Sequence, residues 1–265
     1  MSIPTKFLPI LCDPMSGGPL EYREDHLFNA AKQKRYAIVD SIPILLEESD
    51  LGPQNLKIQK MYRWMARGFN LADRVGNVLT NNSIVKLRRQ LAEGLSLKPG
   101  DRCLYTSIGT GLDLPYLAER VALEEVELIG LDLSMDMLKQ CKKKIRPYER
   151  SSPLVQANAE RLPFCDRAFD VVFHVGGINL FDQPAQAVKE MARVAKPGAL
   201  VLFADESKEV VREQYKKTNP FTRAACRDIS AEFDPRSWIP NGVADSVYEK
   251  VWNGKGYFLS FRNPG

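Results

Sequence analysis

The chain has 265 residues, of which 44% are hydrophobic and 26% are charged, and its formal net charge is +4. These values are ordinary for a globular cytoplasmic protein with a substantial core, and the small positive excess does not argue for nucleic acid as a partner. No stretch approaches the ~20 apolar residues of a membrane-spanning helix, and residues 1–11 lack the pattern of a secretory signal. We therefore expect a cytoplasmic protein without a membrane span.

Five cysteines are spread through the chain, namely Cys12, Cys103, Cys141, Cys165 and Cys226. Their number is odd and they never form a Cys-x-x-Cys pair, so their spacing indicates neither a disulfide framework nor a metal site. Reduced thiols are the simpler expectation.

The first fifty residues differ from the rest of the chain. Turn residues and the charged stretch 21–26 interrupt short apolar runs, and strand-like runs at 36–39 and 42–46 flank Asp40 and Ser41. This pattern predicts a small β-rich module over residues 1–50, followed by a linker at 47–53.

Residues 55–95 have the three- and four-residue apolar spacing of helices. Asn81, Asn82 and Ser83 are the expected cap of a second helix. We expect residues 51–97 to be a helical cap segment on a domain that spans 51–265.

Strand and helix patterns alternate from residue 103 onward. Strands are expected at 103–108, 126–131, 154–157, 169–174 and 200–204, and helices at 114–122, 134–145 and 184–195. Lys196, Pro197 and Gly198 are expected to end the last helix in a turn. The runs 247–252 and 257–261, separated by Asn253 to Gly256, predict a hairpin. The fold class is therefore α/β: a Rossmann-like, mostly parallel sheet with helices on both faces and an antiparallel C-terminal hairpin.

A small-residue loop, Ser107-Ile108-Gly109-Thr110-Gly111, follows the first of these strands, and Asp132 ends the second. Ligands of such sheets bind beyond the carboxyl ends of the strands, and an acid at this spacing can accept both hydroxyls of a ribose. A dinucleotide site would prefer a third glycine at position 114, where this chain has Leu114. Asp132 could instead be a helix-start acid next to Ser134.

Five stretches, in order, resemble class I S-adenosylmethionine-dependent methyltransferases of the type 11 group, which includes ubiquinone and menaquinone biosynthesis enzymes. They are the loop 107–111, Gly130 to Leu138, Gln156 to Phe164, Phe169 to Val172 and Arg193 to Gly198. The resemblance covers residues ~55–205.

The resemblance implies S-adenosylmethionine as cofactor, with S-adenosylhomocysteine as product and no metal. It implies that Ser107, Gly109, Thr110 and Gly111 meet the methionine part, that Asp132 meets the ribose, and that Asn158 and Ala159 meet the adenine. Leu133, next to Asp132, is also expected to bind the cofactor. The family normally has an acid on the first strand that helps to hold the cofactor's amino end, and this chain has Tyr105 at that position.

Residues 1–50 are similar to small zinc-ribbon domains found beside some methyltransferases. Such a ribbon uses four cysteines in two pairs, but here only Cys12 remains and Met15 stands where its partner would fall. We expect no zinc and an apolar core in its place.

Methyl transfer requires mainly alignment of nucleophile, methyl and sulfur. His174, at the end of the fourth strand, is the candidate general base, and a histidine that merely lines the pocket is the alternative. Tyr62 is a candidate for contact with the sulfonium, although helical core packing is an alternative for both Tyr62 and Phe69. Asp205 and Glu206 are expected either to line the acceptor pocket or to have a capping or solvent-exposed role.

Three functions are compatible with these observations. The first is transfer of a methyl group to carbon or oxygen of a small, largely apolar acceptor. The second is an RNA-modifying methyltransferase, which the front module and slight basic excess suggest. The third is a cofactor-binding protein that transfers no methyl group, and Tyr105 is the one sequence feature that suggests it.

Overall fold

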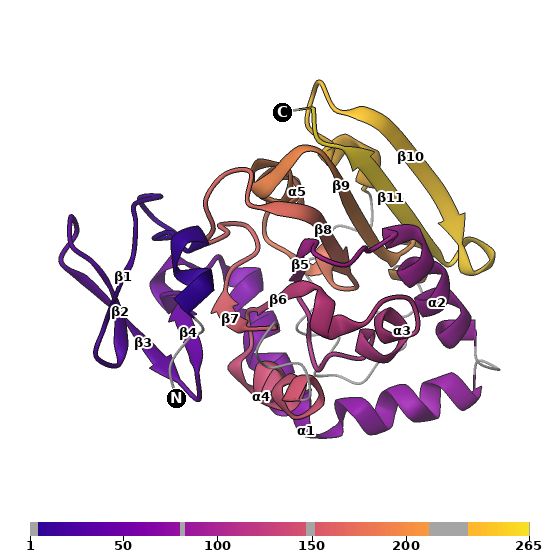
Figure 1. Ribbon diagram of the computed structural model, residues 1–265. Coiled ribbons are helices and arrows are strands. Elements are labelled where there is room, and N and C mark those ends of the chain that lie inside the picture. Colours follow the sequence, from indigo (N-terminus) through magenta and orange to yellow (C-terminus); the bar gives the residue numbers. More distant parts are fainter. Residues whose placement is uncertain (1–4, 80–82, 147–151, 212–232, 265) are drawn as a thin grey trace.

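The computed structural model describes residues 5–79, 83–146, 152–211 and 233–264. They form one eleven-stranded sheet in the order β1-β2-β3-β4-β7-β6-β5-β8-β9-β11-β10 (Figure 1). The expected caps Asn81 and Asn82, and also Cys226, lie outside these ranges.

The central strands of the sheet are parallel, as the alternating pattern predicts. They are β5 (Arg102–Thr106), β6 (Glu127–Asp132), β7 (Leu154–Ala157), β8 (Phe169–Val175) and β9 (Ala195–Glu206). The strands β10 (Ala244–Val251) and β11 (Gly256–Arg262) form the predicted antiparallel hairpin, and β11 pairs antiparallel with β9. Strand order reverses at β5, which lies between β6 and β8. Ligands of open α/β sheets bind at such a reversal.

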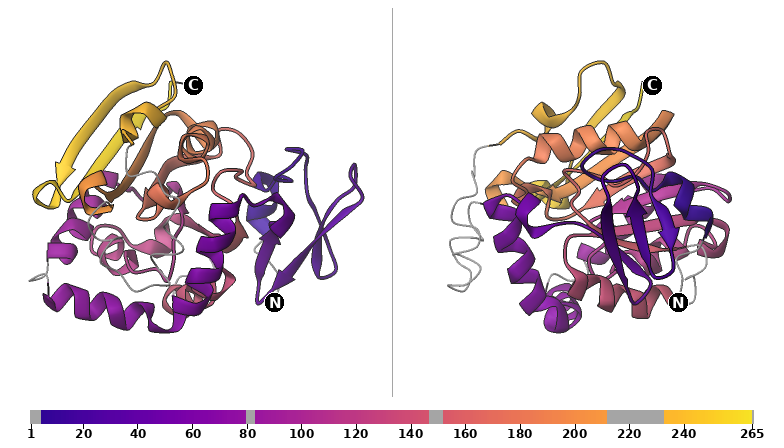
Figure 2. Two further views of the ribbon diagram at one scale, coloured as in Figure 1. Left: turned by 180° about the vertical axis from the view of Figure 1, so that it is seen from behind. Right: turned by 90° about the vertical axis from the view of Figure 1, so that its left-hand side faces the viewer.

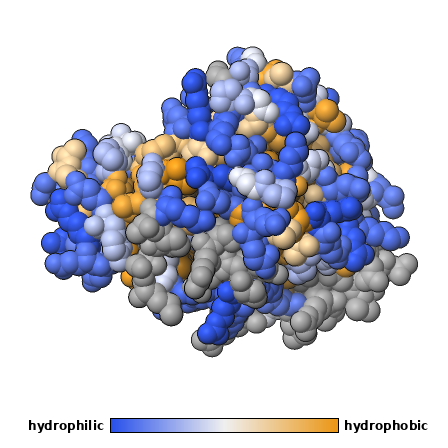
Figure 3. Space-filling view, viewed as in Figure 1, coloured by the Kyte–Doolittle hydropathy of each residue, from blue (hydrophilic) through white to orange (hydrophobic). Residues whose placement is uncertain are grey.

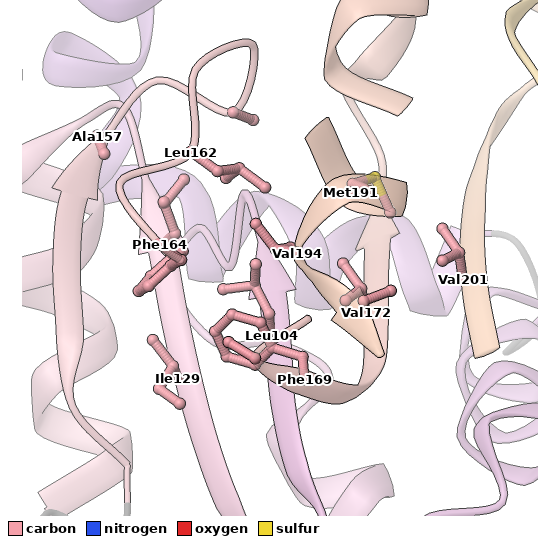
Figure 4. Close-up of a cluster of buried hydrophobic side chains, with 14 of the residues drawn as sticks. Leu104, Ile129, Ala157, Leu162, Phe164, Phe169, Val172, Met191, Val194 and Val201 are labelled. Atoms are coloured by element: carbon pink, nitrogen blue, oxygen red, sulfur yellow. The ribbon is translucent and has the colours of Figure 1, made fainter. Parts of the chain in front are cut away.

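Helices cover both faces of the sheet. The helices α2 (Ser83–Leu95), α3 (Leu114–Ala118) and α4 (Met135–Ile145) pack with strand residues in one core cluster. The helix α5 (Pro184–Val194) packs on the opposite face, where Met191 and Val194 lie near Phe169 and Leu104 (Figure 4). The helix α1 (Pro53–Leu79) contacts α4 and runs along the lower part of the molecule in Figure 1. The predicted helical cap segment is thus α1 and α2.

Two expected boundaries were wrong. The turn expected at Lys196 to Gly198 belongs to β9, which begins at Ala195 opposite Phe169. Gly198 has a φ of +75°, a left-handed conformation that suits glycine. The glycine thus keeps a conformation typical of turns inside an irregular part of strand β9. The helix expected at 114–122 ends at Ala118.

The N-terminal strands extend the sheet instead of forming a separate layer. They are β1 (Glu21–Arg23), β2 (His26–Asn29), β3 (Lys34–Val39) and β4 (Ile42–Leu45), so the charged stretch expected to interrupt strands contains one. Asp40 and Ser41 join β3 to β4 with φ of +52° and +62°, as a tight hairpin turn requires. β4 then pairs parallel with β7, which places this module at one end of the sheet (Figures 1 and 2).

A buried carboxylate occupies the first turn of this module. Asp13 Oδ2 accepts hydrogen bonds from Asn29 Nδ2 and Tyr36 Oη, both at 2.8 Å, and Asp13 Oδ1 accepts from the backbone N–H of Met15 and Ser16. Burial opposes the charge, but these donors outweigh it and lower the pKa of Asp13 to about 2. Leu20, Leu27 and Tyr36 are also buried, so the expected apolar core is accompanied by a hydrogen-bonded acid.

The expectation that all cysteines are reduced was wrong. Cys12 and Cys165 form a disulfide between the N-terminal module and the loop after β7. Backbone hydrogen bonds flank it, from Cys12 N–H to Pro163 O at 3.0 Å and from Cys165 N–H to Ile10 O at 2.9 Å. Spacing along the chain could not reveal this pair, because the two cysteines are 153 residues apart.

The surface seen in Figure 3 is mostly hydrophilic, with hydrophobic side chains scattered between polar ones. No helix in the described ranges is long and apolar enough to cross a membrane.

Candidate functional site

A chamber of about 560 Å³ lies at the carboxyl ends of β5, β6, β8 and β9. We call it the main chamber. Its lining includes the loop after β5, Asp132 and Leu133 after β6, and residues of α1. Its position at the reversal of strand order is the one that the fold class predicts for a ligand.

The loop 107–111 owes its shape to residues in left-handed conformations. Gly109 has a φ of +57°, and a Cβ placed there would meet no atom within 4 Å, so its backbone is open to a ligand. Gly111 has a φ of +70°, and its Cβ would approach Leu114 and Cys141 to 2.6 and 2.9 Å. Gly111 does not line the chamber and serves the packing of α3 and α4 instead. Ser107 lines the chamber and has a φ of +58° where a glycine would be unstrained.

Thr110 connects this loop to α1. Its side chain is buried and donates from Oγ1 to Asn70 Oδ1 at 2.7 Å, and Lys144 of α4 donates to the same oxygen at 3.0 Å. The loop, α1 and α4 are therefore held together at the edge of the main chamber.

Asp132, the acid expected to meet a ribose, lines the main chamber. Its Oδ2 accepts from the Gly109 N–H and its Oδ1 from the Ser134 N–H, both at 2.8 Å. Burial raises the pKa of Asp132 to about 6, and the backbone donors only partly offset this effect. The sequence left two roles open for Asp132, a ligand-binding acid or an acid at the start of a helix. The structure is compatible with both, because Asp132 lines the main chamber and also precedes the Ser134 cap of α4.

A buried ion pair lies beside Tyr105 of β5. Tyr105 donates its hydroxyl to Asp113 Oδ2, and Arg88 of α2 contacts Asp113 Oδ1 at 3.2 Å. Burial and the charge of Asp113 raise the pKa of Tyr105 well above its ordinary value, so the phenol remains a donor. All three residues line the main chamber, so a carboxylate is present there although the strand itself carries a tyrosine.

The helix α1 forms one wall of the main chamber. Tyr62 and Phe69 line it and pack edge to face, with their ring centroids 6.1 Å apart. The start of this helix is held by Asp182, whose carboxylate accepts from the backbone N–H of Gln54 at 3.0 Å and Asn55 at 2.8 Å. Such an acid at a helix N-terminus satisfies donors that lack partners within the helix.

Asn158 and Ala159 do not line the main chamber. Asn158 faces a separate polar cavity of about 710 Å³ beside the disulfide, and its Oδ1 accepts from the Glu160 N–H at 3.0 Å. Ala159 is buried. The structure therefore brings Ser107, Gly109, Thr110, Asp132, Leu133 and Tyr62 together in the lining of the main chamber, whereas neither of the two expected adenine residues lines it.

His174 does not reach the main chamber either. It is fully buried, with its Nδ1 3.1 Å from Thr106 Oγ1 and its ring edge to face with Phe181. Burial lowers the pKa of His174 to about 3. A buried, neutral ring without access to the chamber cannot take a proton from an acceptor there, which removes the basis for expecting His174 to be the base.

Asp205 and Glu206 end β9 at the rim of the main chamber. Asp205 Oδ2 accepts from the N–H groups of Gly177 and Asn179 at 3.0 and 2.9 Å, and Oδ1 accepts from Glu206 N–H. Asp205 thus caps the loop after β8 and lines the chamber at once. Burial and the neighbouring Asp205 raise the pKa of Glu206 to about 7.

A second, largely apolar chamber of about 220 Å³ adjoins the first, and we call it the side chamber. Leu87 and Leu91 of α2 form one wall, and Trp252 and Phe258 of the C-terminal hairpin form another. Six residues line both chambers, which shows that they are neighbours: Arg88, Asp113, Val175, Gly176, Asp205 and Glu206.

Sequence reasoning missed Arg88, Asp113 and Asp182. Arg88 shares a helical face with Ile84, Leu87 and Leu91, so its position suggested a half-buried side chain. Asp113 follows the glycine loop by two residues. Asp182 had no local signal for its role, because the helix that it caps lies 127 residues earlier in the chain.

Comparison with known proteins agrees with this geometry. Residues 104–203 match the methyltransferase domain family. A demethylmenaquinone methyltransferase of Lysinibacillus sphaericus is 34% identical over 139 residues, which are 52% of this chain and 58% of that protein. The ubiquinone/menaquinone biosynthesis C-methyltransferase UbiE of Syntrophotalea carbinolica is 34% identical over 172 residues, 62% of this chain and 68% of that protein.

The chain thus spans less than two thirds of the Lysinibacillus relative and just over two thirds of the Syntrophotalea one. The solved structure of the cyclase SpnF shares the fold at 16% identity, with a TM-score of 0.54, over 81% of this chain and 98% of that one. The sheet order, the site at its reversal and these relatives agree: the chain belongs to the class I S-adenosylmethionine-dependent methyltransferase family.

Proposed function

We propose that this protein transfers a methyl group from S-adenosylmethionine to carbon or oxygen of a small, largely apolar acceptor. The observation that carries the proposal is the juxtaposition of Asp132 with the open backbone of Gly109 in the main chamber. A buried carboxylate beside an unobstructed glycine is suited to a ligand with adjacent hydroxyls.

The residues of the main chamber fit this cofactor. Its volume of about 560 Å³ lies in the ordinary range of small-molecule sites. In this proposal Asp132 and Leu133 hold the ribose, and Ser107, Gly109 and Thr110 meet the methionine part while Gly111 shapes the loop. Asn158 and Ala159 follow Gln156, which pairs with Asp132 in the sheet, and in this proposal they contact the adenine.

Asp113 takes the place of the acid that the family resemblance implies at position 105, where this chain has a tyrosine. An ammonium group needs a carboxylate partner, and Asp113 supplies one in the main chamber, oriented by the Tyr105 hydroxyl. Arg88, paired with the same acid, offers a cation to a carboxylate. The pair therefore presents both signs of charge to the amino acid end of the cofactor.

The bound cofactor supplies a methyl group already activated on a sulfonium. The protein therefore has to align the groups and exclude water. The α1 wall, with Tyr62 and Phe69, covers the chamber with apolar and aromatic side chains. In this proposal Tyr62, which lines the chamber, is the aromatic ring that contacts the sulfonium.

The acceptor class rests on the side chamber and on the relatives. The side chamber has mostly apolar walls, and the two relatives above are named for methylation in quinone biosynthesis. Both features favour an acceptor with an apolar, ring-containing body.

Calorimetry with S-adenosylmethionine tests the proposal directly. We expect Asp132→Ala to lose about 1–3 kcal/mol of binding free energy, because buried ribose hydroxyls lose an ionic hydrogen-bond partner. Asp25→Ala, at an exposed side chain of the N-terminal module, is the matched control. Equal affinity of the parent and Asp132→Ala would refute the placement of the cofactor.

Two other functions have distinct signatures. An RNA-modifying enzyme would bind RNA with a steep dependence on salt. A protein that binds the cofactor without transferring methyl would yield no S-adenosylhomocysteine with any acceptor, and the shared fold with a cyclase shows that the fold alone does not decide the reaction.

We also propose that residues 1–50 are a ribbon-like module without a metal and that residues 51–265 are the catalytic domain. The Asp13 network stabilises the turn where a ribbon would carry a cysteine pair. A cytoplasmic location remains part of this proposal. The Cys12–Cys165 pair makes it testable, since thiol titration of protein from intact cells would show whether the bond is formed there.

A further inference from the structure

We propose that Glu206 is the general base of the reaction, and that it takes the proton from a hydroxyl of an aromatic or enolic acceptor whose apolar body lies in the side chamber. The inference rests on the proposed function and adds to it the base and the chemical class of the acceptor.

Glu206 lies where the two chambers meet. It lines both of them, and its side chain is only half-buried. A donor in the main chamber and an acceptor in the side chamber would have their reacting atoms near this junction.

Among the described residues, Glu206 is the acid of these chambers whose side chain is not already engaged. Asp132 accepts from Gly109 and Ser134, and Asp113 is held by Tyr105 and Arg88. Asp205 accepts three backbone N–H groups. In the described part of the chain no hydrogen bond or ion pair holds the Glu206 carboxylate, and burial and the charge of Asp205 are the influences on it. It is therefore available to accept a proton from a ligand.

The backbone of Glu206 is well fixed, which suits a residue that must meet an acceptor at a set distance. Its N–H donates to Asp205 Oδ1 at 2.8 Å, and its carbonyl accepts from Asn179 Nδ2 at 2.8 Å. Asn179 is in turn held by the Tyr257 hydroxyl at 3.0 Å, and Gly256 of β11 pairs with Glu206 in the sheet.

The acidity of Glu206 matches this role. Burial first, and then the charge of Asp205, raise its pKa to about 7, where a carboxylate is a stronger base than in water yet still ionised. The titratable and charged groups around it come from several elements: Asp205 of β9, Tyr105 of β5, Arg88 of α2, Asp113 before α3, and Tyr257 of β11. Arg88 and Asp113 pair with each other, and burial holds both tyrosines in the neutral form.

The step balances without another reactant. Glu206 takes the hydroxyl proton, and the electron pair of the resulting oxyanion, or of the carbon conjugated with it, forms the bond to the methyl carbon. The carbon–sulfur bond breaks and its electron pair returns to sulfur, which neutralises the sulfonium. When carbon is the nucleophile, that carbon then loses its own proton to water.

The test uses 1-naphthol, a stable aromatic hydroxyl compound, titrated calorimetrically into the full-length protein saturated with S-adenosylhomocysteine. We expect the parent to bind 1-naphthol about tenfold more tightly at pH 8 than at pH 5.5, because only ionised Glu206 accepts a strong hydrogen bond. Glu206→Gln should bind about tenfold more weakly at pH 8 and show no dependence on pH. Glu209→Gln, an exposed acid three residues on, should behave as the parent.

A second variant tests the side chamber itself. Leu87→Trp fills the wall formed by α2, so it should abolish 1-naphthol binding while the affinity for S-adenosylhomocysteine stays within about twofold. If reduced demethylmenaquinone is turned over, Glu206→Gln should lower kcat by about 10²–10⁴-fold and remove the acidic limb near pH 7 from the profile of kcat.

Affinity for S-adenosylhomocysteine separates the possible failures. Unchanged affinity in Glu206→Gln shows that the variant is folded, and no binding to the parent would refute the proposed function. If the parent binds S-adenosylhomocysteine but fails to bind 1-naphthol, or if Glu206→Gln binds 1-naphthol as the parent does, the inference about Glu206 and the side chamber is overturned.

Discussion

Asp132 is a buried acid of the main chamber whose charge changes close to neutral pH. Its carboxylate organises the loop by accepting from Gly109, and the same burial that strengthens this contact makes the charge costly. Its pKa of about 6 lies just below neutral pH, so the ionised form that can accept ribose hydroxyls prevails at pH 7 and is lost below pH 6.

We therefore predict that the affinity for S-adenosylmethionine falls by about tenfold between pH 7 and pH 5, since only about a tenth of Asp132 is ionised at the lower pH. Asp132→Asn should bind weakly at both pH values and remove this dependence. Calorimetry at pH 5, 6 and 7 measures it. A parent whose affinity does not change over this range would show that Asp132 does not titrate in contact with the ligand.

Glu206 leads to a prediction about stability at the same scale. Its pKa in the folded protein, about 7, exceeds its ordinary value of 4.5, so the folded state binds the proton more strongly than the unfolded state. The favourable contribution is complete below pH 4.5 and is lost as pH rises through 7. Glu206→Gln should accordingly raise the free energy of unfolding at pH 8 by about 1–2 kcal/mol, allowing for partial exposure, and have little effect at pH 4.5. Denaturant melts at both pH values test this, and equal effects at the two would contradict the raised pKa.

At the scale of elements, α1 depends on a distant residue for its placement over the main chamber. Asp182 caps the first turn, and Gly52 approaches it so closely that a Cβ there would lie 2.4 Å from the carboxylate. The close approach explains why a residue without a side chain precedes this helix. The wall of the site therefore depends on a contact between α1 and the loop before α5.

Asp182→Ala should weaken this anchor and cost about 0.5–2 kcal/mol of stability, the usual effect of losing a helix cap. We further expect faster amide hydrogen exchange in the first turns of α1 and weaker binding of S-adenosylmethionine, while β5 and β6 remain protected. Glu124→Ala, at an exposed acid outside the site, provides the comparison. Unchanged exchange at residues 54–58 would mean that the cap does not hold the helix in place.

At the scale of the whole molecule, two connections join the N-terminal module to the rest of the protein. One is the parallel pairing of β4 with β7, and the other is the Cys12–Cys165 disulfide with its flanking backbone hydrogen bonds. The disulfide closes a loop of 153 residues, so it restricts the unfolded chain strongly.

Reduction should lower the free energy of unfolding by about 2–4 kcal/mol, the typical contribution of a native disulfide. A Cys12→Ser, Cys165→Ser double variant should show the reduced stability under all conditions and no response to dithiothreitol. Thermal melts of the two proteins, with and without the reductant, are the measurement. A parent that melts at the same temperature in both conditions would exclude a stabilising role for this bond.

Much of the fold follows from local pattern. The alternation of apolar runs predicts the parallel strands, the interval between Gly111 and Asp132 places the loop and the acid at one edge of the sheet, and Asn253 to Gly256 predicts the hairpin. These features depend on contacts between near neighbours or on the regular geometry of strands and helices. The errors at β1 and at the start of β9 arose where polar or turn-forming residues are held in strands by pairing with partners elsewhere in the chain.

The sequence by itself determined the class of fold and the positions of the loop at residues 107–111 and of the acid at residue 132. These features depend on backbone propensity and side-chain periodicity, which involve residues close together in the chain. Only the tertiary structure decided that Asp113 accepts the Tyr105 hydroxyl, that Asp182 caps α1, that Cys12 reaches Cys165 and that His174 is enclosed. Each of these depends on which side chains the packed sheet and helices bring together or shut away from solvent, and no spacing along the chain encodes that.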